Sequence, residues 1–156
     1  SLDTNAYLDG VRSLMELADI VKASDEDIEA LQLDPDPRRS AELAFGTMKS
    51  GMLVFTEGRG GAVLINANGS LEKSAYPIAN IEDTVGAGDT FHSAFLAALL
   101  RTGQLNKSLS EVSQDSLGDA VDFACAAAAI NVSRKGCSPP THKEVDDFIE
   151  STHRQR

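Results

Sequence analysis

The sequence has 156 residues, 42% hydrophobic and 24% charged, which is enough for one domain with its own core and too short for two full ones. Its 24 acidic and 14 basic residues give a net charge of −10, which disfavours non-specific binding to nucleic acid or to an anionic membrane. No apolar run approaches the roughly 20 residues of a membrane-spanning helix. Neither nucleic acid nor a membrane is therefore expected as a partner. Cys125 and Cys137 form no disulfide framework or metal cluster, which favours a reducing, cytoplasmic setting.

In chain order, the hydrophobic pattern predicts strands and helices that alternate through the first half of the sequence. Helices are expected over residues 7–17, 24–33, 37–49, 88–101, 117–133 and 141–152, and strands over 18–22, 52–56, 62–66 and 71–75. Ser24 is a helix cap followed by acidic residues, and Asn66-Ala-Asn-Gly69 is a hairpin turn. The alternation predicts βαβ units and hence an α/β fold with a mostly parallel sheet.

The segment Asp83-Thr-Val-Gly-Ala-Gly-Asp-Thr-Phe91 carries the clearest chemical signal. Gly86, Ala87 and Gly88 allow a tight turn, and the helix that follows begins with unpaired N–H groups and a positive dipole end. Such a turn suits a phosphoryl group in transfer. Asp89 lies at its mouth, where a carboxylate repels phosphate but can accept a proton from an attacking hydroxyl. Taken alone, the same residues also fit a simple glycine turn with Asp89 as a helix cap.

A second glycine-rich segment, Thr56-Glu-Gly-Arg-Gly-Gly61, follows the strand expected at 52–56. Ligands of open α/β sheets bind at the carboxyl ends of the strands. Thr56 supplies a hydroxyl there, and Gly58 and Gly61 allow close approach of the backbone. The sequence contains no Walker A loop, and no G-x-G-x-x-G follows the first strand, which disfavours a Rossmann-type dehydrogenase.

These residues resemble the ribokinase-like carbohydrate kinases, also called the PfkB family, whose C-terminal signature is D-T-x-G-A-G-D-x-F. Residues 18–24, 56–61, 123–130 and 132–136 resemble further family segments in the same order. The resemblance covers nearly the whole chain but only the C-terminal half of the family's pattern. It implies a truncated three-layer α/β/α fold with a mostly parallel central sheet, in which residues 1–156 form the nucleotide-binding and catalytic-base portion of a single domain.

The resemblance also implies ATP-dependent phosphorylation of a sugar hydroxyl, with Mg²⁺ arriving on the ATP. By position, Asp89 is the expected catalytic base, and the N–H groups of Gly86, Ala87 and Gly88 are the expected anion hole. The expected nucleotide-binding residues are Ser24, Thr56, Gly58, Gly61 and Cys125, the last facing the adenine although its alanine-rich surroundings predict a buried thiol. A monovalent cation such as K⁺ is expected beside the anion hole, held by Asp83 and by backbone carbonyls near Val85, Asn131, Arg134 and Gly136.

Departures from the family pattern indicate the branch. Lys22-x-Ser24 with following acids is similar to fructokinases and 2-keto-3-deoxygluconate kinases, whereas ribokinases carry N-x-x-E at the positions of Ser24 and Asp27. Asp3-Thr-Asn-Ala-Tyr7 has Tyr where those branches tend to have an Arg, the natural clamp for a carboxylate, which weakens the case for an acidic sugar. A fructokinase-like sugar kinase is therefore expected. A 2-keto-3-deoxygluconate or nucleoside kinase, and a non-catalytic nucleotide-binding module, are the alternatives.

The family's N-terminal half has no counterpart in this sequence. That half supplies most sugar contacts, the first strands of the sheet and a lid over the sugar. Because positioning is most of the catalysis in phosphoryl transfer, the chain by itself is expected to be inactive. The missing strands leave an exposed sheet edge, which favours self-association into a homo-oligomer.

Overall fold

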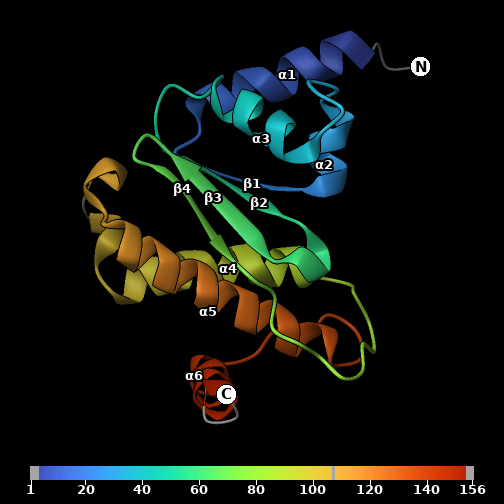
Figure 1. Ribbon diagram of the computed structural model, residues 1–156, viewed down its shortest axis with the longest axis vertical. Helices are drawn as coiled ribbons and strands as arrows, with labels where there is room; N and C mark the ends of the chain where they lie inside the picture. Colours follow the sequence, from blue (N-terminus) through green and yellow to red (C-terminus); the bar gives the residue numbers. More distant parts are fainter. Residues whose placement is uncertain (1–3, 107, 154–156) are drawn as a thin grey trace.

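The computed structural model describes residues 4–106 and 108–153 (Figure 1), so Asp3 of the Asp3–Tyr7 segment lies outside the described residues. The helices are α1 (Thr4–Leu17), α2 (Asp25–Ala30), α3 (Pro37–Phe45), α4 (Ala87–Arg101), α5 (Gln114–Val132) and α6 (His142–His153). The strands are β1 (Ile20–Ser24), β2 (Met52–Thr56), β3 (Ala62–Asn66) and β4 (Gly69–Lys73), and short 3₁₀ turns cover Gly58–Gly60, Gln104–Asn106 and Leu109–Glu111. Each predicted helix and strand is present, with some ends shifted by a few residues.

The four strands form one sheet in the order β1-β2-β3-β4. β1 and β2 are parallel, because α2 and α3 lie between them in the sequence, whereas β2–β3 and β3–β4 are antiparallel. The sheet described here is therefore mixed rather than mostly parallel. The connections after β2 and β3 are too short for the crossover that parallel neighbours need, and the predicted Asn66–Gly69 turn closes a hairpin instead.

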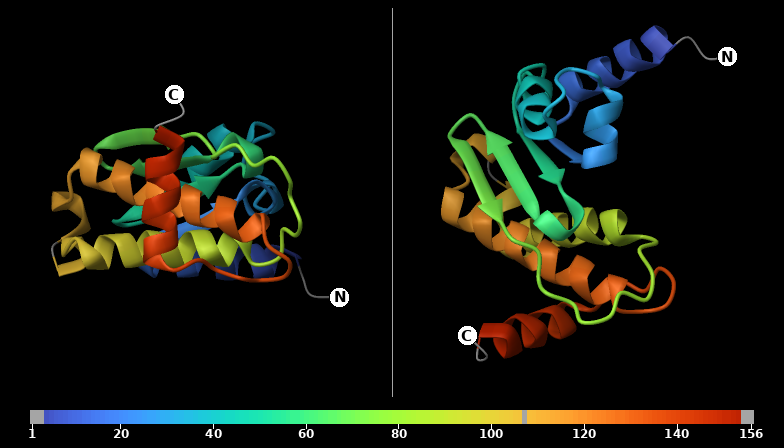
Figure 2. Two further views of the ribbon diagram at one scale, coloured as in Figure 1. Left: turned by 90° about the horizontal axis from the view of Figure 1, so that it is seen from below. Right: turned by 45° about the vertical axis from the view of Figure 1, so that its right-hand side comes forward.

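Helices cover both faces of the sheet (Figures 1 and 2). α1, α2 and α3 lie on one face and α4 and α5 on the other, with α6 on the far side of α5. Strand residues alternate between two cores: Leu53 and Phe55 belong to the core beside α1–α3, and Met52 and Val54 to the core beside α4 and α5. This arrangement confirms the three-layer α/β/α fold.

Local sequence explains where the helices next to the sheet begin. Ser24 caps α2 in a capping box, in which the Ser24 N–H donates to Asp27 Oδ2 at 2.9 Å and the Asp27 N–H donates to Ser24 Oγ at 3.2 Å. The side chain of Asp36 caps α3 by accepting from the Arg39 N–H at 2.9 Å, and Pro37 is the first residue of that helix. Both helix starts are thereby fixed at the edge where β1 and β2 end.

Apolar surface remains exposed at the β1 side of the sheet. β1 has a strand neighbour on one side only within the described residues, so the predicted sheet edge is present. On α1, Leu14 and Leu17 are 69% and 77% exposed. In the part of the chain that the structure describes, no helix is both long enough and apolar enough to cross a bilayer.

Candidate active site

The ends of β1 and β2 bring polar side chains to the face of the sheet that α4 covers. Lys22 pairs in register with Val54, which packs into the core beside α4 and α5. Because alternate residues of a strand share a face, Ser24 and its register partner Thr56 lie on this same face. An ammonium and two hydroxyl-bearing residues therefore meet at the carboxyl edge of the sheet, where ligands of α/β proteins bind.

The bend between residues 83 and 89 leads into the N-terminus of α4. Gly86 adopts the left-handed conformation with φ 74°, which favours glycine, and a Cβ at this position would lie 2.3 Å from Cys137 Sγ, so Cys137 would have to shift. In the described structure the N–H groups of Gly86, Gly88 and Asp89 have no hydrogen-bond acceptor, whereas the Ala87 N–H donates to the Thr84 carbonyl at 3.2 Å. The turn itself thus uses the Ala87 amide, and the role of these N–H groups as an anion hole stays a prediction.

Lys22 adds a positive charge to this bend. Its Nζ lies 3.1 Å from the position that a Cβ would take on Gly88. The ammonium and the positive end of the α4 dipole therefore favour an anion at the same place. Sequence reasoning used Lys22 only as part of a branch pattern and missed this contact. The signal was its spacing, since Lys22 stands two residues before Ser24 on the same face of β1.

Asp89 lies in the first turn of α4 with an exposed side chain. The residue at the N-cap position of α4 is Gly86, and it makes no side-chain capping bond, so the alternative in which Asp89 caps the helix is wrong. Within residues 4–106 and 108–153, no hydrogen bond or ion pair occupies the Asp89 carboxylate. The carboxylate is available to accept a proton beside the open amides.

The hydroxyl of Ser24 is committed to the α2 cap. It donates to Asp27 Oδ2 at 2.8 Å and accepts from the Asp27 N–H. The hydrogen bond from the Ser24 backbone N–H lowers the pKa of Asp27, against a smaller opposing effect of burial, and the nearby charge of Lys22 contributes in the same direction. Ser24 thus orders the end of β1. Of the two residues, Lys22 has the positive charge that attracts a phosphate.

Two buried or half-buried side chains tie the bend to the loop after α5. The Asp83 carboxylate accepts from the Val85 N–H at 2.9 Å and from the Gly136 N–H at 3.1 Å. Asn131, which is fully buried, donates from Nδ2 to the Val85 carbonyl at 3.0 Å and accepts at Oδ1 from the Ser138 N–H at 2.9 Å. The two loops consequently run side by side at one end of the molecule (Figure 2).

This linked pair of loops contains the predicted cation ligands. Asp83, Val85, Asn131 and Gly136 are brought together by the bonds above, whereas the Arg134 side chain pairs with Glu144 of α6 and donates to the Ser138 carbonyl at 3.4 Å. Among the described residues no group of three or more His, Cys, Asp or Glu side chains could hold a metal ion. A cation here would therefore depend on one carboxylate and on backbone carbonyls, a donor set that suits a hard ion of low charge.

The remaining predicted nucleotide residues differ in how they are placed. Thr56 Oγ1 points back to the Ala23 carbonyl at 3.5 Å, and Gly58 is exposed with open space beside it. A Cβ on Gly61 would lie 2.1 Å from the Lys73 carbonyl oxygen, so β4 requires this glycine whether or not a ligand binds. The motif itself does not reveal this requirement, because it does not show the path of β4.

Cys125 is not brought to the bend. It lies in the middle of α5, six residues or about 9 Å along the helix from Asn131. Its side chain is 6% exposed within the core, and burial, followed by the charge of Asp122, raises the pKa of its thiol to about 12. The expectation of a buried thiol is confirmed, and contact with adenine stays a prediction.

Comparison with known proteins identifies the family. The sequence pattern of the pfkB family carbohydrate kinases matches residues 1–144. The chain is 28% identical over 150 residues to Probable fructokinase-5 of Arabidopsis thaliana, covering 95% of this chain and 44% of that protein. It is 32% identical over 143 residues to fructokinase-1 of Oryza sativa subsp. japonica, covering 90% of this chain and 42% of that protein.

A solved structure shows the same fold. The fructokinase of Vibrio cholerae O395, in its fructose, ADP and calcium ion bound form, superimposes with a TM-score of 0.76 at 25% identity, covering 92% of this chain and 45% of that chain. The chain therefore spans less than half the length of these relatives. With the family pattern matched along most of the chain and the fold shared, the chain belongs to the pfkB family of carbohydrate kinases.

Proposed function

We propose that this chain is the nucleotide-binding and proton-accepting portion of a kinase that transfers phosphate from ATP to a sugar hydroxyl. The observation that supports this most directly is the grouping at the start of α4, where the unpaired amides of Gly86 and Gly88, the ammonium of Lys22 and the carboxylate of Asp89 lie together. Positive groups stabilise the negative charge on a phosphoryl group in transfer, and a carboxylate beside them can take up the proton of the attacking hydroxyl.

The proposed step transfers the γ-phosphoryl group of ATP to the sugar hydroxyl. The sugar hydroxyl oxygen forms a bond to the γ-phosphorus of ATP, the bond from that phosphorus to the bridging oxygen breaks, and ADP leaves. The proton of the hydroxyl passes to the Asp89 carboxylate and then to solvent. The amides of Gly86 and Gly88 and the Lys22 ammonium face the oxygens of the phosphoryl group. Mg²⁺ would arrive bound to the ATP phosphates, since it prefers phosphates and waters to a set of protein ligands.

A monovalent cation belongs to the same proposal. Asp83 and the carbonyls near Val85, Asn131, Arg134 and Gly136 are its proposed ligands, and the Asp83 carboxylate already joins the two loops that would surround it. A K⁺ ion there would stiffen the bend before α4 without touching the sugar. Thr56 and Gly58 are proposed to line the nucleotide phosphates.

The proposed sugar is fructose or a close relative. Fructokinases of Arabidopsis thaliana and Oryza sativa match this chain over 90% or more of its length, and the Vibrio cholerae fructokinase was solved with fructose and ADP. We also propose that residues 1–156 form the C-terminal portion of one ribokinase-like domain. Because the chain covers 42 to 45% of these proteins, it should turn over slowly without the remainder of that domain.

The test uses the complete polypeptide that contains this chain. Incubated with ATP and, in turn, fructose, 2-keto-3-deoxygluconate and ribosides, it is expected to release ADP fastest with fructose. Asp89→Asn should lower kcat by about 10²–10⁴-fold, as loss of a general base does, while ATP affinity changes little. Asp115→Asn is the matched control, because Asp115 is also an exposed acid in the first turn of a helix.

Two outcomes contradict the proposal. Unchanged turnover by the Asp89→Asn variant would remove the catalytic role of that carboxylate. If the protein binds ATP but releases ADP with none of the three sugar classes, the alternative is favoured, a nucleotide-binding module that catalyses no reaction.

A further inference from the structure

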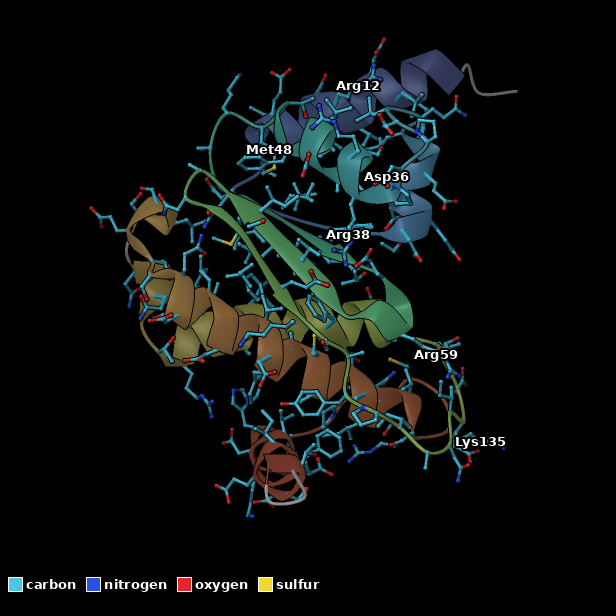
Figure 3. All side chains as sticks on the ribbon, in the orientation of Figure 1. Arg12, Asp36, Arg38, Met48, Arg59 and Lys135 are labelled. Carbon is cyan, nitrogen blue, oxygen red and sulfur yellow. The ribbon has the colours of Figure 1, made fainter. Side chains whose placement is uncertain are left out.

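Arg38 joins α3 both to the loop after β2 and to β4. Its Nε and Nη2 donate to the two oxygens of Glu57 at 3.0 and 2.7 Å, and its Nη1 and Nη2 donate to the two oxygens of Glu72 at 3.1 and 2.8 Å. One guanidinium therefore holds two carboxylates, each at two points. Two-point pairs of this kind are stronger and more directional than single contacts. In Figure 3 Arg38 lies between α3 and the strands.

The contact lies on the opposite face of the sheet from the candidate active site. Phe55 packs into the core beside α3, Thr56 turns to the α4 face, and Glu57 turns back toward α3, where it meets Arg38. Arg38 also lines a cavity of about 550 Å³ that opens on the α3 face of β3 and β4. The sheet separates the guanidinium from the predicted phosphate site, and Glu57 is the Arg38 partner that belongs to the glycine-rich loop.

The loop after β2 is compact, and hydrogen bonds link Glu57 to Gly60 and Gly61 within it. The Glu57 N–H donates to the Gly61 carbonyl at 2.9 Å, and the Gly60 N–H donates to the Glu57 carbonyl at 2.8 Å. A Cβ on Gly60 would lie 3.1 Å from Glu57 Cβ, so the glycine makes room for the glutamate. Holding the Glu57 side chain consequently holds all of residues 57–61, including the exposed Gly58.

Glu57 is also an acid within a loop proposed to bind phosphates. A carboxylate that swung toward the nucleotide would repel it. Only 22% of the Glu57 side chain is exposed, and both of its oxygens accept from Arg38. Arg38 lies in the first turn of α3, one residue after Pro37 and two after the Asp36 cap.

Resting on the proposed function, we propose that Arg38 is a positioning residue for the nucleotide. It acts through Glu57, fixing the 57–61 loop and keeping its carboxylate turned away from the phosphates. Neither the glycine motif nor the predicted site residues point to this role, because Arg38 is far from the loop in the sequence.

The test measures ATP binding to this chain by calorimetry in the presence of MgCl₂. Arg38→Ala is expected to weaken binding about fivefold or more, and to speed hydrogen exchange at the amides of residues 58–61. Arg39→Ala is the matched control, because Arg39 is the next residue of α3 and its ion pair, with Glu42 at 2.9 Å, stays within that helix. It should change affinity less than twofold.

A second substitution separates this role from a purely structural one. Adding Glu57→Gln to the Arg38→Ala variant is expected to restore part of the lost affinity, because the neutral side chain no longer repels the phosphates. Equal affinity of Arg38→Ala and the unsubstituted chain, or no recovery in the double variant, overturns the inference. If the unsubstituted chain itself binds no ATP, the proposed function fails and this inference with it, an outcome distinct from a loss confined to the variants.

Discussion

The side-chain amide of Asn131 donates to the Val85 carbonyl at 3.0 Å, and this bond joins the last turn of α5 to the bend before α4. The other end of the amide accepts from the Ser138 N–H at 2.9 Å. One fully buried side chain thus fixes two loops at once. The position of the open amides at the start of α4 depends on a residue that need not touch a ligand.

Replacing Asn131 with Asp should lower the free energy of unfolding by roughly 1–3 kcal/mol. The carboxylate keeps an acceptor for the Ser138 N–H but loses the donor to the Val85 carbonyl and places a charge in a buried site. Urea denaturation gives the comparison. Asn68→Asp, at the exposed tip of the hairpin, is the control and should be nearly neutral. Equal stability of the two variants would mean that the amide does not hold the bend.

Gly86→Ala should destabilise the chain more than Gly103→Ala, by roughly 1–3 kcal/mol. Both glycines have a similar positive φ, 74° and 71°, so both substitutions carry the same backbone penalty. A Cβ at Gly86 would meet Cys137 Sγ at 2.3 Å, whereas nothing lies within 4 Å of one at Gly103. The difference in thermal or urea midpoint between the Gly86→Ala and Gly103→Ala variants therefore measures the clash of the new Cβ with Cys137. Identical midpoints would show that Cys137 moves aside without cost.

One of the two cysteines should react with a thiol reagent in the native protein. Cys137 is exposed, whereas burial raises the pKa of the Cys125 thiol to about 12, which leaves almost no thiolate at pH 8. Titration with Ellman's reagent is expected to detect one thiol in buffer and two in denaturant, and Cys137→Ser should abolish the native reaction. Rapid reaction of a second thiol with the reagent in the absence of denaturant would contradict the buried placement of Cys125.

Acid should remove a stabilising contribution of Glu144. Hydrogen bonds from the backbone and the hydroxyl of Thr141, then from Arg134, lower the pKa of Glu144 from its ordinary 4.5 to about 2. Because the folded-state pKa is lowered, the stabilisation is present above pH 4.5 and is lost as the pH falls from 4.5 toward 2. Glu144→Gln should therefore lower the melting temperature at pH 7 and differ less from the parent near pH 2.

Glu111→Gln, which removes an exposed acid from the turn at Leu109–Glu111, is the control for the change in net charge. If the melting temperature of the Glu144→Gln variant stays below that of the parent by the same amount from pH 7 to pH 2, the ionised carboxylate is not stabilised by Thr141 and Arg134.

The sequence pattern predicted the positions of the helices and strands better than it predicted which strands pair and in which direction. β2 and β3 have the predicted ends, since apolar runs with glycines or turn residues beside them leave little choice. β4 begins at Gly69 rather than residue 71, because the hairpin turn takes only two residues and pairs Gly69 with Asn66. The antiparallel direction of β3 was missed, although the short loop before it already excluded a crossover.

In the site, the glycine spacing was enough to predict the bend and Asp89. It could not show that the turn uses the Ala87 amide, because that depends on backbone angles. The approach of Lys22 to Gly88 joins residues far apart in the sequence, and only the folded chain creates it. Asn131 was predicted for its carbonyl, whereas its side chain makes the bonds described above.

The mixed sheet also orders the events of folding. β2, β3 and β4 are consecutive and joined by short turns, so their pairing closes small loops, whereas pairing of β1 with β2 must close over α2 and α3. Contacts between distant residues form later, because more chain entropy is lost before they stabilise anything. The meander is thus expected to form first and β1 to join it afterwards. Lys22 and Ser24 would then reach Thr56 only in that later step, so a polypeptide stalled before it would contain ordered strands but no assembled polar cluster.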